Sequence, residues 1–420
     1  MLIKNGRIID PSQQLDEQCD ILIQDGKIMK IAKEIIAEEE VIDATGWIVA
    51  PGFVDVHVHF RDPGFTYKED LETGSRAGAK GGFTSVICMA NTNPIIDNAE
   101  LLRSLYDRSK ELPIHVYFAS AVSKGFDGKT LCDYEELIKA GAICFTDDGK
   151  PLSDTNFLKT AMSAIAKTNQ IISLHEELPE YVKEAGIHAG TVAKAMGLHG
   201  AMREAEWKIV ERDIAIAKET NARMHVQHIS SKEAVELVRK AKAEGLAITA
   251  EATPHHFTLT HEAINTHGTL AKMNPPLREE SDRLAIIEGL KDGTIDVIAT
   301  DHAPHSVEEK NREFTKAPSG ITGLETSFSL GYEQLVKAHH LSLSALIDKM
   351  SVQPAQLFQL PAGSLKVGAI ADLVLIDLNE TYKYDETLSK ASNSPFMNQT
   401  LQGKVKMTIV NGTIVYQDSI

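Results

Sequence analysis

Strand-like apolar runs that alternate with helix-like segments constrain the fold of this chain more than any other feature of its sequence. Eight such runs can be distinguished: 53–60, TSVICMANT, IHVYFASAV, GAICFTDDG, QIISLHEE, RMHVQHIS, AITAEATPHHF and DVIATDHAPH. Helical patterns such as DYEELIKA and SKEAVELVRKAKAEG separate most of them. Eight β–α units predict an α/β fold, a TIM-type (β/α)8 barrel. An open doubly wound sheet is the alternative, but no strand is followed by the glycine fingerprint that such sheets often carry.

The two ends of the chain are predicted to form short antiparallel strands. Asx-Gly dipeptides at Asn5, Asp25 and Asn411 lie between alternating apolar residues, which is a strong signal for β-hairpins. Because isolated hairpins are only marginally stable in water, we expect both ends to pair in one small β-sandwich.

The expected domains are a composite β-sandwich of residues 1–51 and 364–420 and a barrel of residues 52–363. A chain of 420 residues with 43% hydrophobic content can bury a core of this size. Its net charge of −16 and lack of a basic run argue against a nucleic-acid partner. No apolar segment reaches membrane-spanning length, and the four cysteines are scattered without a CxxC pair. We therefore expect a cytoplasmic protein with no membrane partner.

Polar side chains are unusual in a buried strand, yet GFVDVHVHFRDPG, residues 52–64, carries several. Strand alternation predicts two faces, one with Phe53, Asp55, His57 and His59 and an apolar one with Val54, Val56, Val58 and Phe60. Residues two apart in a strand lie roughly 6.6 Å from each other, so His57 and His59 can bind one metal ion. Two hydrogen-bonded core histidines are the alternative, and further ligands are needed to decide.

The carboxyl ends of the other predicted strands supply those ligands. Active sites of such barrels lie at these ends, which carry Arg61, Asn91, Asp148, His175, His228, Asp301 and His305. With the two histidines of the first strand, four histidines and two aspartates converge on one mouth. This nitrogen and oxygen set suits two divalent ions, most naturally zinc. Because His225, Asp147 and His302 lie an odd number of residues from ligands of this set, they are expected to point away, His225 toward the helices.

Several motifs together resemble one family. DVHVHFRDPG, MANTNP, FTDDG, HIS, MNPPLR and ATDHAPH are similar to those of the dihydroorotases of the amidohydrolase superfamily, specifically the longer bacterial (class I) branch. The resemblance covers essentially the whole chain, and HFRDPG with MANTNP is its most specific part. It implies two zinc ions (Zn²⁺) per subunit and the interconversion of N-carbamoyl-L-aspartate and L-dihydroorotate in pyrimidine synthesis.

The resemblance also implies a role for each ligand. His57, His59 and Asp301 would bind one zinc ion, His175 and His228 the other, and Asp148 and a hydroxide would bridge the two. Asp301 would in addition move the proton between the attacking water and the amide nitrogen. Related hydantoinases use a carbamylated lysine as the bridge, but GAICFTDDG contains no lysine and Lys150 lies beyond the strand end.

Substrate contacts are expected around Arg61, whose guanidinium suits the carboxylate of dihydroorotate. Asn91 and His305 end the neighbouring strands and would flank it, whereas Asn274, held by two prolines, would contact the ring. The resemblance adds His59, Ser319 and Gly320, although the family usually has an aromatic residue where Ser319 stands. The charged stretch between His305 and Gly320 fits a mobile loop over the mouth and a solvated loop equally well.

Two other functions compete with this interpretation. A hydantoinase, dihydropyrimidinase or allantoinase would share the fold and metals but would not need Arg61, because its substrate lacks that carboxylate. A non-catalytic scaffold of the same superfamily should have lost ligands, whereas this chain keeps all six candidates. The resemblance further implies a homodimer and leaves open a complex with aspartate carbamoyltransferase.

Overall fold

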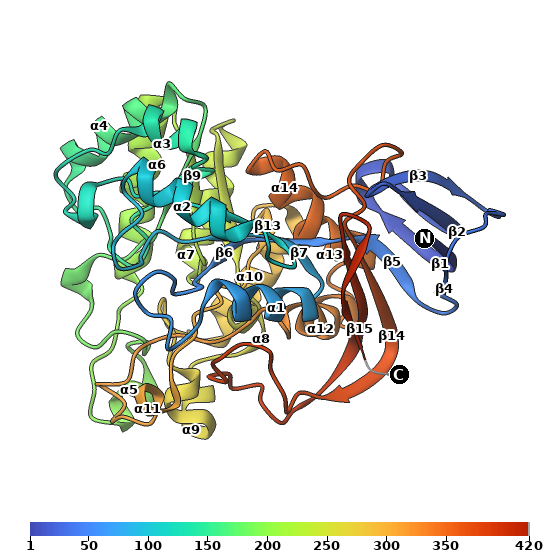
Figure 1. Cartoon of the computed structure of the whole chain (residues 1–420). Helices are drawn as coiled ribbons and strands as arrows, with labels where there is room; N and C mark the ends of the chain where they lie inside the picture. Colours follow the sequence, from blue (N-terminus) through green and yellow to red (C-terminus); the bar gives the residue numbers. More distant parts are fainter. Residues whose placement is uncertain (419–420) are drawn as a thin grey trace.

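Parallel strands close into a barrel, which lies beside the sheet of the terminal strands (Figure 1). The computed structural model describes residues 1–418. Its barrel strands are β6 (Phe53–Val58), β7 (Phe83–Cys88), β8 (His115–Phe118), β9 (Cys144–Phe145), β10 (Ile171–Leu174), β11 (Arg223–Val226), β12 (Ile248–Ala252) and β13 (Val297–Ile298). Sheets of three and five strands are joined by the parallel bridges Ser120–Phe145 and Val58–His302. The predicted (β/α)8 barrel is therefore confirmed.

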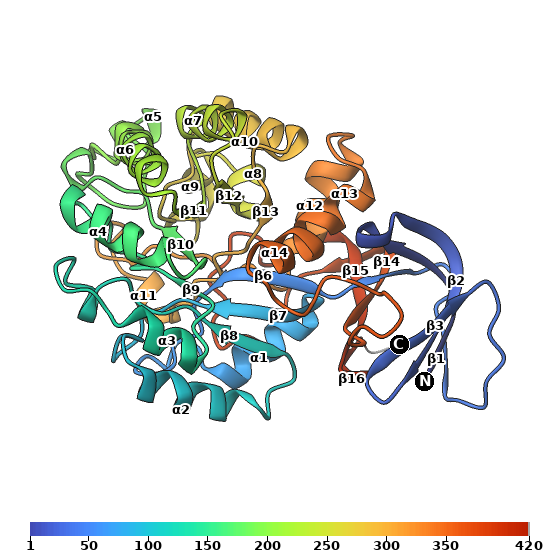
Figure 2. The ribbon, with the colours of Figure 1, turned by 90° about the horizontal axis from the view of Figure 1, so that it is seen from above.

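Helices surround these strands, as the view from above shows (Figure 2). The longer ones are α1 (Leu71–Lys80), α2 (Ala99–Ser109), α3 (Tyr134–Ala140), α4 (Thr155–Ala166), α6 (Glu204–Thr220), α7 (Lys232–Ala243) and α10 (Glu280–Asp292). The short ones are α5 (Thr191–Ala195), α8 (Pro254–Thr258), α9 (Ala263–His267), α11 (Val307–Lys310), α12 (Ser327–Gly331), α13 (Leu343–Ile347) and α14 (Gln353–Leu357). Side chains that accept a backbone N–H cap the first turn of five outer helices: Asp70, Asn98, Asp133, Asp154 and Ser231.

Strand β6 does not keep the regular alternation expected from its sequence. Val54 and Val56 pack with inward residues of the other strands and with Phe358 just after α14, whereas Phe53 and Val58 join the larger core under the helices. The ladder is irregular after Asp55, whose carboxylate accepts the N–H of His57 at 3.0 Å. The prediction of one apolar face was therefore wrong, because this irregularity resets the alternation.

Strands from both termini build the second domain, as predicted (Figure 1). They are β1 (Leu2–Asp10), β2 (Leu15–Gln24), β3 (Lys27–Ala32), β4 (Val41–Asp43), β5 (Ile48–Pro51), β14 (Leu373–Lys383), β15 (Thr400–Val410) and β16 (Thr413–Gln417). Antiparallel pairing of β5 with β14 joins the two ends in one sheet. An apolar core of its own, which includes Ile21, Val49 and Leu375, holds this β-sandwich together.

The three Asx-Gly dipeptides do not all form hairpin turns. Asp25 and Asn411 adopt positive φ angles of 48° and 50° at the turns between β2 and β3 and between β15 and β16, as predicted. The hairpin expected at Asn5 was wrong, because β1 continues through it as a bulge. The carboxylate of Asp20 accepts the N–H of Asn5 at 3.0 Å and stabilises this bulge.

One segment of the C-terminal half leaves the sheet. Residues 385–398, between β14 and β15, extend to the barrel, where Ser389 and Asn393 are buried. The side-chain amide of Asn393 donates to the carbonyl of Ala303 at 3.0 Å.

Within residues 1–418, no helix combines the length and the apolar character needed to cross a bilayer.

Candidate metal centre

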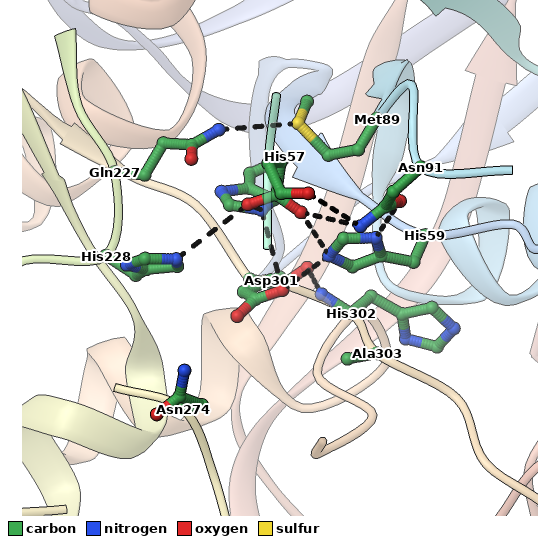
Figure 3. Close-up of polar contacts among 12 residues, drawn as sticks. His57, His59, Met89, Asn91, Gln227, His228, Asn274, Asp301, His302 and Ala303 are labelled. Atoms are coloured by element: carbon green, nitrogen blue, oxygen red, sulfur yellow. Dashed lines mark hydrogen bonds and ion pairs between the residues drawn. The ribbon is translucent and has the colours of Figure 1, made fainter. Parts of the chain in front are cut away.

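The six predicted ligands lie together at the carboxyl ends of the barrel strands. His57 and His59 come from the end of β6, and the others follow their strands: Asp148 after β9, His175 after β10, His228 after β11 and Asp301 after β13. None of the six is more than 7% exposed. In Figure 3 the side chains of His57, His59 and Asp301 turn toward one another.

Two overlapping groups of donor atoms have the spacing of metal ligands. In the first, of His57, His59 and Asp301, the ligand atoms lie within 4.8 Å of one another. Asp301 Oδ1 is 2.9 Å from His59 Nε2 and 3.6 Å from His57 Nε2. The second group combines His57, Asp148 and His228.

The carboxylate of Asp148 lies between all four histidines. Its Oδ1 is 3.5 Å from His57 Nε2, 3.8 Å from His175 Nδ1 and 4.0 Å from His228 Nε2. Its Oδ2 is 3.6 Å from His59 Nε2. A carboxylate in this position can contribute one oxygen to each of two ions.

The electrostatics of the cluster fit a divalent cation. His57 Nε2 is buried and has no hydrogen-bond partner among the described residues. Burial alone would lower the pKa of His57, but Glu251, Asp301 and Asp148 raise it well above its usual value. The negative field that favours a proton on His57 also favours a cation, and buried imidazole and carboxylate donors suit zinc.

Glu251 is a residue that sequence reasoning missed. It lies on β12, is 1% exposed, and accepts hydrogen bonds from His57 Nδ1 at 2.5 Å and His225 Nε2 at 3.0 Å. The first bond leaves His57 Nε2 free to bind metal, which is the usual role of a carboxylate behind a histidine ligand. An acidic residue inside the apolar run AITAEA was the available signal.

The bond to Glu251 also corrects the expected orientation of His225. This imidazole was predicted to face the helices, but it points to Glu251 and Thr249, inside the barrel. The prediction counted residues from His228, which lies beyond the end of β11 with a φ of 30°, so strand alternation no longer applies there.

Three neighbouring residues point elsewhere, as expected. Asp147 accepts the N–H groups of Val122 and Ser123. His302 Nε2 donates to Glu69 at 3.3 Å. Lys150 is exposed, so the lysine nearest to Asp148 in the sequence is not part of the cluster.

Arg61 stands beside the cluster without a carboxylate partner within residues 1–418. Its sequence neighbour Asp62 is paired with Arg108 instead, at 2.9 and 2.5 Å. Arg61 Nε donates to the carbonyl of Pro304 at 3.2 Å, and its Nη2 lies 3.5 Å from His305 Nε2. The guanidinium is thus held at the mouth by neutral groups and keeps its charge available for an anion.

His305 is fixed on both ring nitrogens. Its Nδ1 accepts from Lys68 Nζ at 3.2 Å, so its Nε2 carries the proton and donates to the carbonyl of Ser319 at 2.8 Å. Burial and the nearby cation of Arg61 lower the pKa of His305 to about 2, so the ring is neutral. A Cβ at position 320 would lie only 2.6 Å from this ring, and Gly320 avoids that contact because it has no side chain.

The two asparagines differ in their contacts. Asn91 contacts two ligands, because its Oδ1 accepts from His59 Nδ1 at 3.0 Å and its Nδ2 donates to Asp148 Oδ2 at 2.9 Å. Asn274 Nδ2 lies 3.5 Å from His175 Nε2, and its buried Oδ1 has no partner among the described residues. Asn274 therefore retains an acceptor for a bound molecule.

Two buried lysines fasten the stretch between His305 and Gly320. Lys310 Nζ donates to the carbonyls of Pro318 and Gly320, each at 3.0 Å. Lys272 Nζ donates to those of Phe314 and Ala317, each at 2.7 Å. The stretch is thus a wall of the mouth that hydrogen bonds hold in place.

These features define a class of protein, a (β/α)8-barrel enzyme with a buried imidazole and carboxylate centre. A model described as the amidohydrolase family matches residues 48–415. Two dihydroorotases, from Clostridioides difficile (strain 630) and Lactococcus lactis subsp. lactis (strain IL1403), are 54% and 50% identical to this chain. Each alignment covers 99% of this chain and 99% of the relative. The chain therefore belongs to the amidohydrolase family, and within it to the dihydroorotases.

Solved structures support the same fold. An L-hydantoinase (dihydropyrimidinase) from Arthrobacter aurescens has a TM-score of 0.90 at 27% identity, covering 100% of this chain and 96% of that one. A dihydropyrimidinase from Brevibacillus agri NCHU1002 has a TM-score of 0.86 at 24% identity, covering 99% and 95%. Because these identities are about half those to the dihydroorotases, they support the architecture rather than a hydantoinase function.

Proposed function

We propose that this chain interconverts N-carbamoyl-L-aspartate and L-dihydroorotate. Identities of 48–54% to several dihydroorotases, over nearly the full length, support this activity. The observation that carries the substrate assignment is Arg61, a cation without a carboxylate partner within residues 1–418, next to the ligand cluster. A hydantoin ring has no carboxylate to offer it.

We propose further that the six ligands hold two zinc ions, with Asp148 as the shared ligand. His57, His59 and Asp301 would bind one ion, and His175 and His228 the other. The ions held there would supply an acidified water and would polarise the carbonyl of the amide that is formed or broken.

The residues of the chain bind the substrate and move the proton. Arg61 pairs with the ring carboxylate, which fixes the orientation of the substrate. Asn274 Oδ1 accepts an N–H of the ring, which uses its unpartnered acceptor. Burial would raise the pKa of Asp301, but the surrounding imidazoles lower it to about 2, so its carboxylate is ionised at neutral pH. Asp301 can therefore take the proton of the attacking water and deliver it to the leaving nitrogen.

The activity is tested by assaying purified protein on carbamoyl-aspartate, dihydroorotate, hydantoin, dihydrouracil and allantoin, with metal content measured on the same sample. We expect turnover of the first two, in opposite directions, and about two zinc ions per chain. Turnover of hydantoin or allantoin in preference to dihydroorotate would refute the proposal, and absence of all turnover in metal-loaded protein would favour a scaffold.

Replacing Asp148 by alanine should sharply reduce metal occupancy, because it removes a ligand from both ions. Loss of an outer-shell partner already costs about 10- to 100-fold in metal affinity, and loss of a shared ligand should cost more. Elemental analysis of the purified variant measures this.

Lys150→Ala is the matched control, because it removes the nearest lysine in the sequence. We expect it to load metal normally, with or without bicarbonate. Wild-type occupancy in Asp148→Ala, or a carbamylated lysine found by mass spectrometry, would overturn the assignment of Asp148.

We propose a homodimer from the family resemblance, and a cytoplasmic location from the cysteine pattern and the lack of a membrane-spanning apolar segment in the sequence. Light scattering of the purified protein, with and without aspartate carbamoyltransferase, measures both its subunit number and any complex. The domain division at residues 51/52 and 363/364, which was drawn from the strand patterns of the sequence, is likewise a proposal.

A further inference from the structure

The segment of residues 385–398 is tied to the reaction mouth although it belongs to the C-terminal strands by sequence. Figure 1 shows this part of the chain running from β14 and β15 toward the barrel. Ser389 and Asn393 within it are 7% and 3% exposed. The segment is therefore packed against the barrel.

One side chain of this segment is bonded to both sides of the mouth wall. Asn393 Oδ1 accepts the N–H of His305 at 2.9 Å. Asn393 Nδ2 donates to the carbonyls of Ala303 at 3.0 Å and Gly320 at 2.9 Å. The Asn393 carboxamide thus links Ala303 and His305, which follow β13, to Gly320, at the C-terminal end of the wall.

The backbone held by Asn393 carries the groups proposed to bind the carboxylate. Pro304, between Ala303 and His305, accepts the bond from Arg61 Nε through its carbonyl. His305 in turn donates to the carbonyl of Ser319, which precedes Gly320. A shift of this backbone would move Arg61 and His305 together.

A second contact from the same segment reaches the residue after Asp301. The buried carboxylate of Glu69 accepts bonds from Ser389 Oγ and the N–H of Lys390, and from His302 Nε2 at 3.3 Å. The segment therefore contacts the mouth at two separate places, through Glu69 and through Asn393. Of these, Asn393 bonds to the backbone beside the groups proposed to bind the substrate carboxylate.

We propose that Asn393 is a positioning residue that sets the geometry of the carboxylate pocket from outside the barrel. This rests on the proposed function, because it takes Arg61 and His305 to bind the carboxylate of the substrate. The requirement for asparagine is chemical. Its amide donates to two carbonyls while its oxygen accepts, whereas an aspartate would face both carbonyls with negative charge. A shorter apolar residue would leave the N–H of His305 and the carbonyl of Ala303 without this partner, while Lys310 would still bond to the carbonyl of Gly320.

Asn393→Asp is the principal test. A displaced binding group can cost about 100-fold, so we expect KM for dihydroorotate to rise by about 10- to 100-fold. Because the carboxylate is bound equally in ground and transition states, kcat should change by less than about threefold, and the zinc content should equal that of wild type. Steady-state kinetics and elemental analysis on the same sample measure all three.

Asn398→Asp is the matched control, because Asn398 lies in the same segment but is exposed. It should leave KM unchanged. If Asn393→Asp does not yield folded protein, Asn393→Ser retains one donor and one acceptor in a smaller side chain, and the same rise in KM is expected in weaker form.

The outcomes separate this inference from the proposed function. Wild-type KM in a folded Asn393 variant would overturn the inference while leaving the function intact. Loss of kcat or zinc with unchanged KM would also overturn it, because Asn393 would then support the metal centre or the fold. A wild-type enzyme that ignores dihydroorotate would refute the proposed function itself.

Discussion

Asp301→Asn should lower kcat by about a hundred- to ten-thousand-fold, the usual range for loss of a general acid–base group. The amide keeps an oxygen near His57 and His59, so most of the metal should remain bound, but it cannot accept the proton. Turnover of dihydroorotate at saturating substrate, with metal content measured in parallel, tests this expectation.

Asp147→Asn is a suitable control for that variant. Asp147 is buried near Asp148 but accepts bonds from Val122 and Ser123 instead of facing the cluster. Burial raises its pKa to about 6. An asparagine has the same shape, and its oxygen can still accept the N–H groups of Val122 and Ser123. Near-normal turnover in Asp301→Asn would assign the proton transfer to another group.

Arg61→Met should lower kcat/KM for dihydroorotate. The loss should correspond to about 2–5 kcal/mol of transition-state stabilisation, the range for truncating one partner of a buried charge pair. Both metal ions should stay bound, since Arg61 bonds only to Pro304 and lies near His305. Arg61→Lys should recover only part of the loss, because an ammonium group cannot form the bidentate pair. Kinetics in both reaction directions measure the effect.

The exposed Arg103 of α2 provides the matched arginine-to-methionine control and should retain wild-type kinetics. Wild-type efficiency of Arg61→Met on dihydroorotate would remove the main chemical reason for preferring dihydroorotase over hydantoinase. The family assignment would stand, but the carboxylate anchor would have to be sought elsewhere.

The sequence was sufficient to predict the barrel and to group its ligands, because both depend on local patterns. Each strand is an apolar run, and parallel strands bring their carboxyl ends to one mouth, so His175 and Asp301 could be grouped without knowing their contacts. Their roles as metal ligands, and those of the substrate contacts, remain predictions to be tested by the variants above.

Residue counting failed where the backbone departs from a regular strand. The irregularity after Asp55 reversed the faces of β6, and the positive φ of His228 hid the inward orientation of His225. The Asn-Gly dipeptide at Asn5 forms a bulge, although the same kind of dipeptide forms a turn elsewhere in this chain. The bulge depends on Asp20 of another strand, whose carboxylate accepts the N–H of Asn5.

Glu251 and Asn393 could not be predicted for a different reason. Glu251 acts on His57, which lies 194 residues away in the sequence, and Asn393 binds the N–H of His305 from 88 residues away. A single acidic or amide side chain has no periodic pattern, and its partners are defined only when distant segments meet.

The pairing of β5 with β14 has a consequence for the order in which the molecule can fold. Strand β5 ends at Pro51 and β14 begins at Leu373, so the ribosome must make the entire barrel between them. Until then β5 presents an unpaired strand edge, which is the kind of surface that promotes aggregation during synthesis. The N-terminal strands are therefore the first to be made and among the last to be completed. A nascent chain whose synthesis stops between β5 and β14 should depend on chaperones to protect that edge.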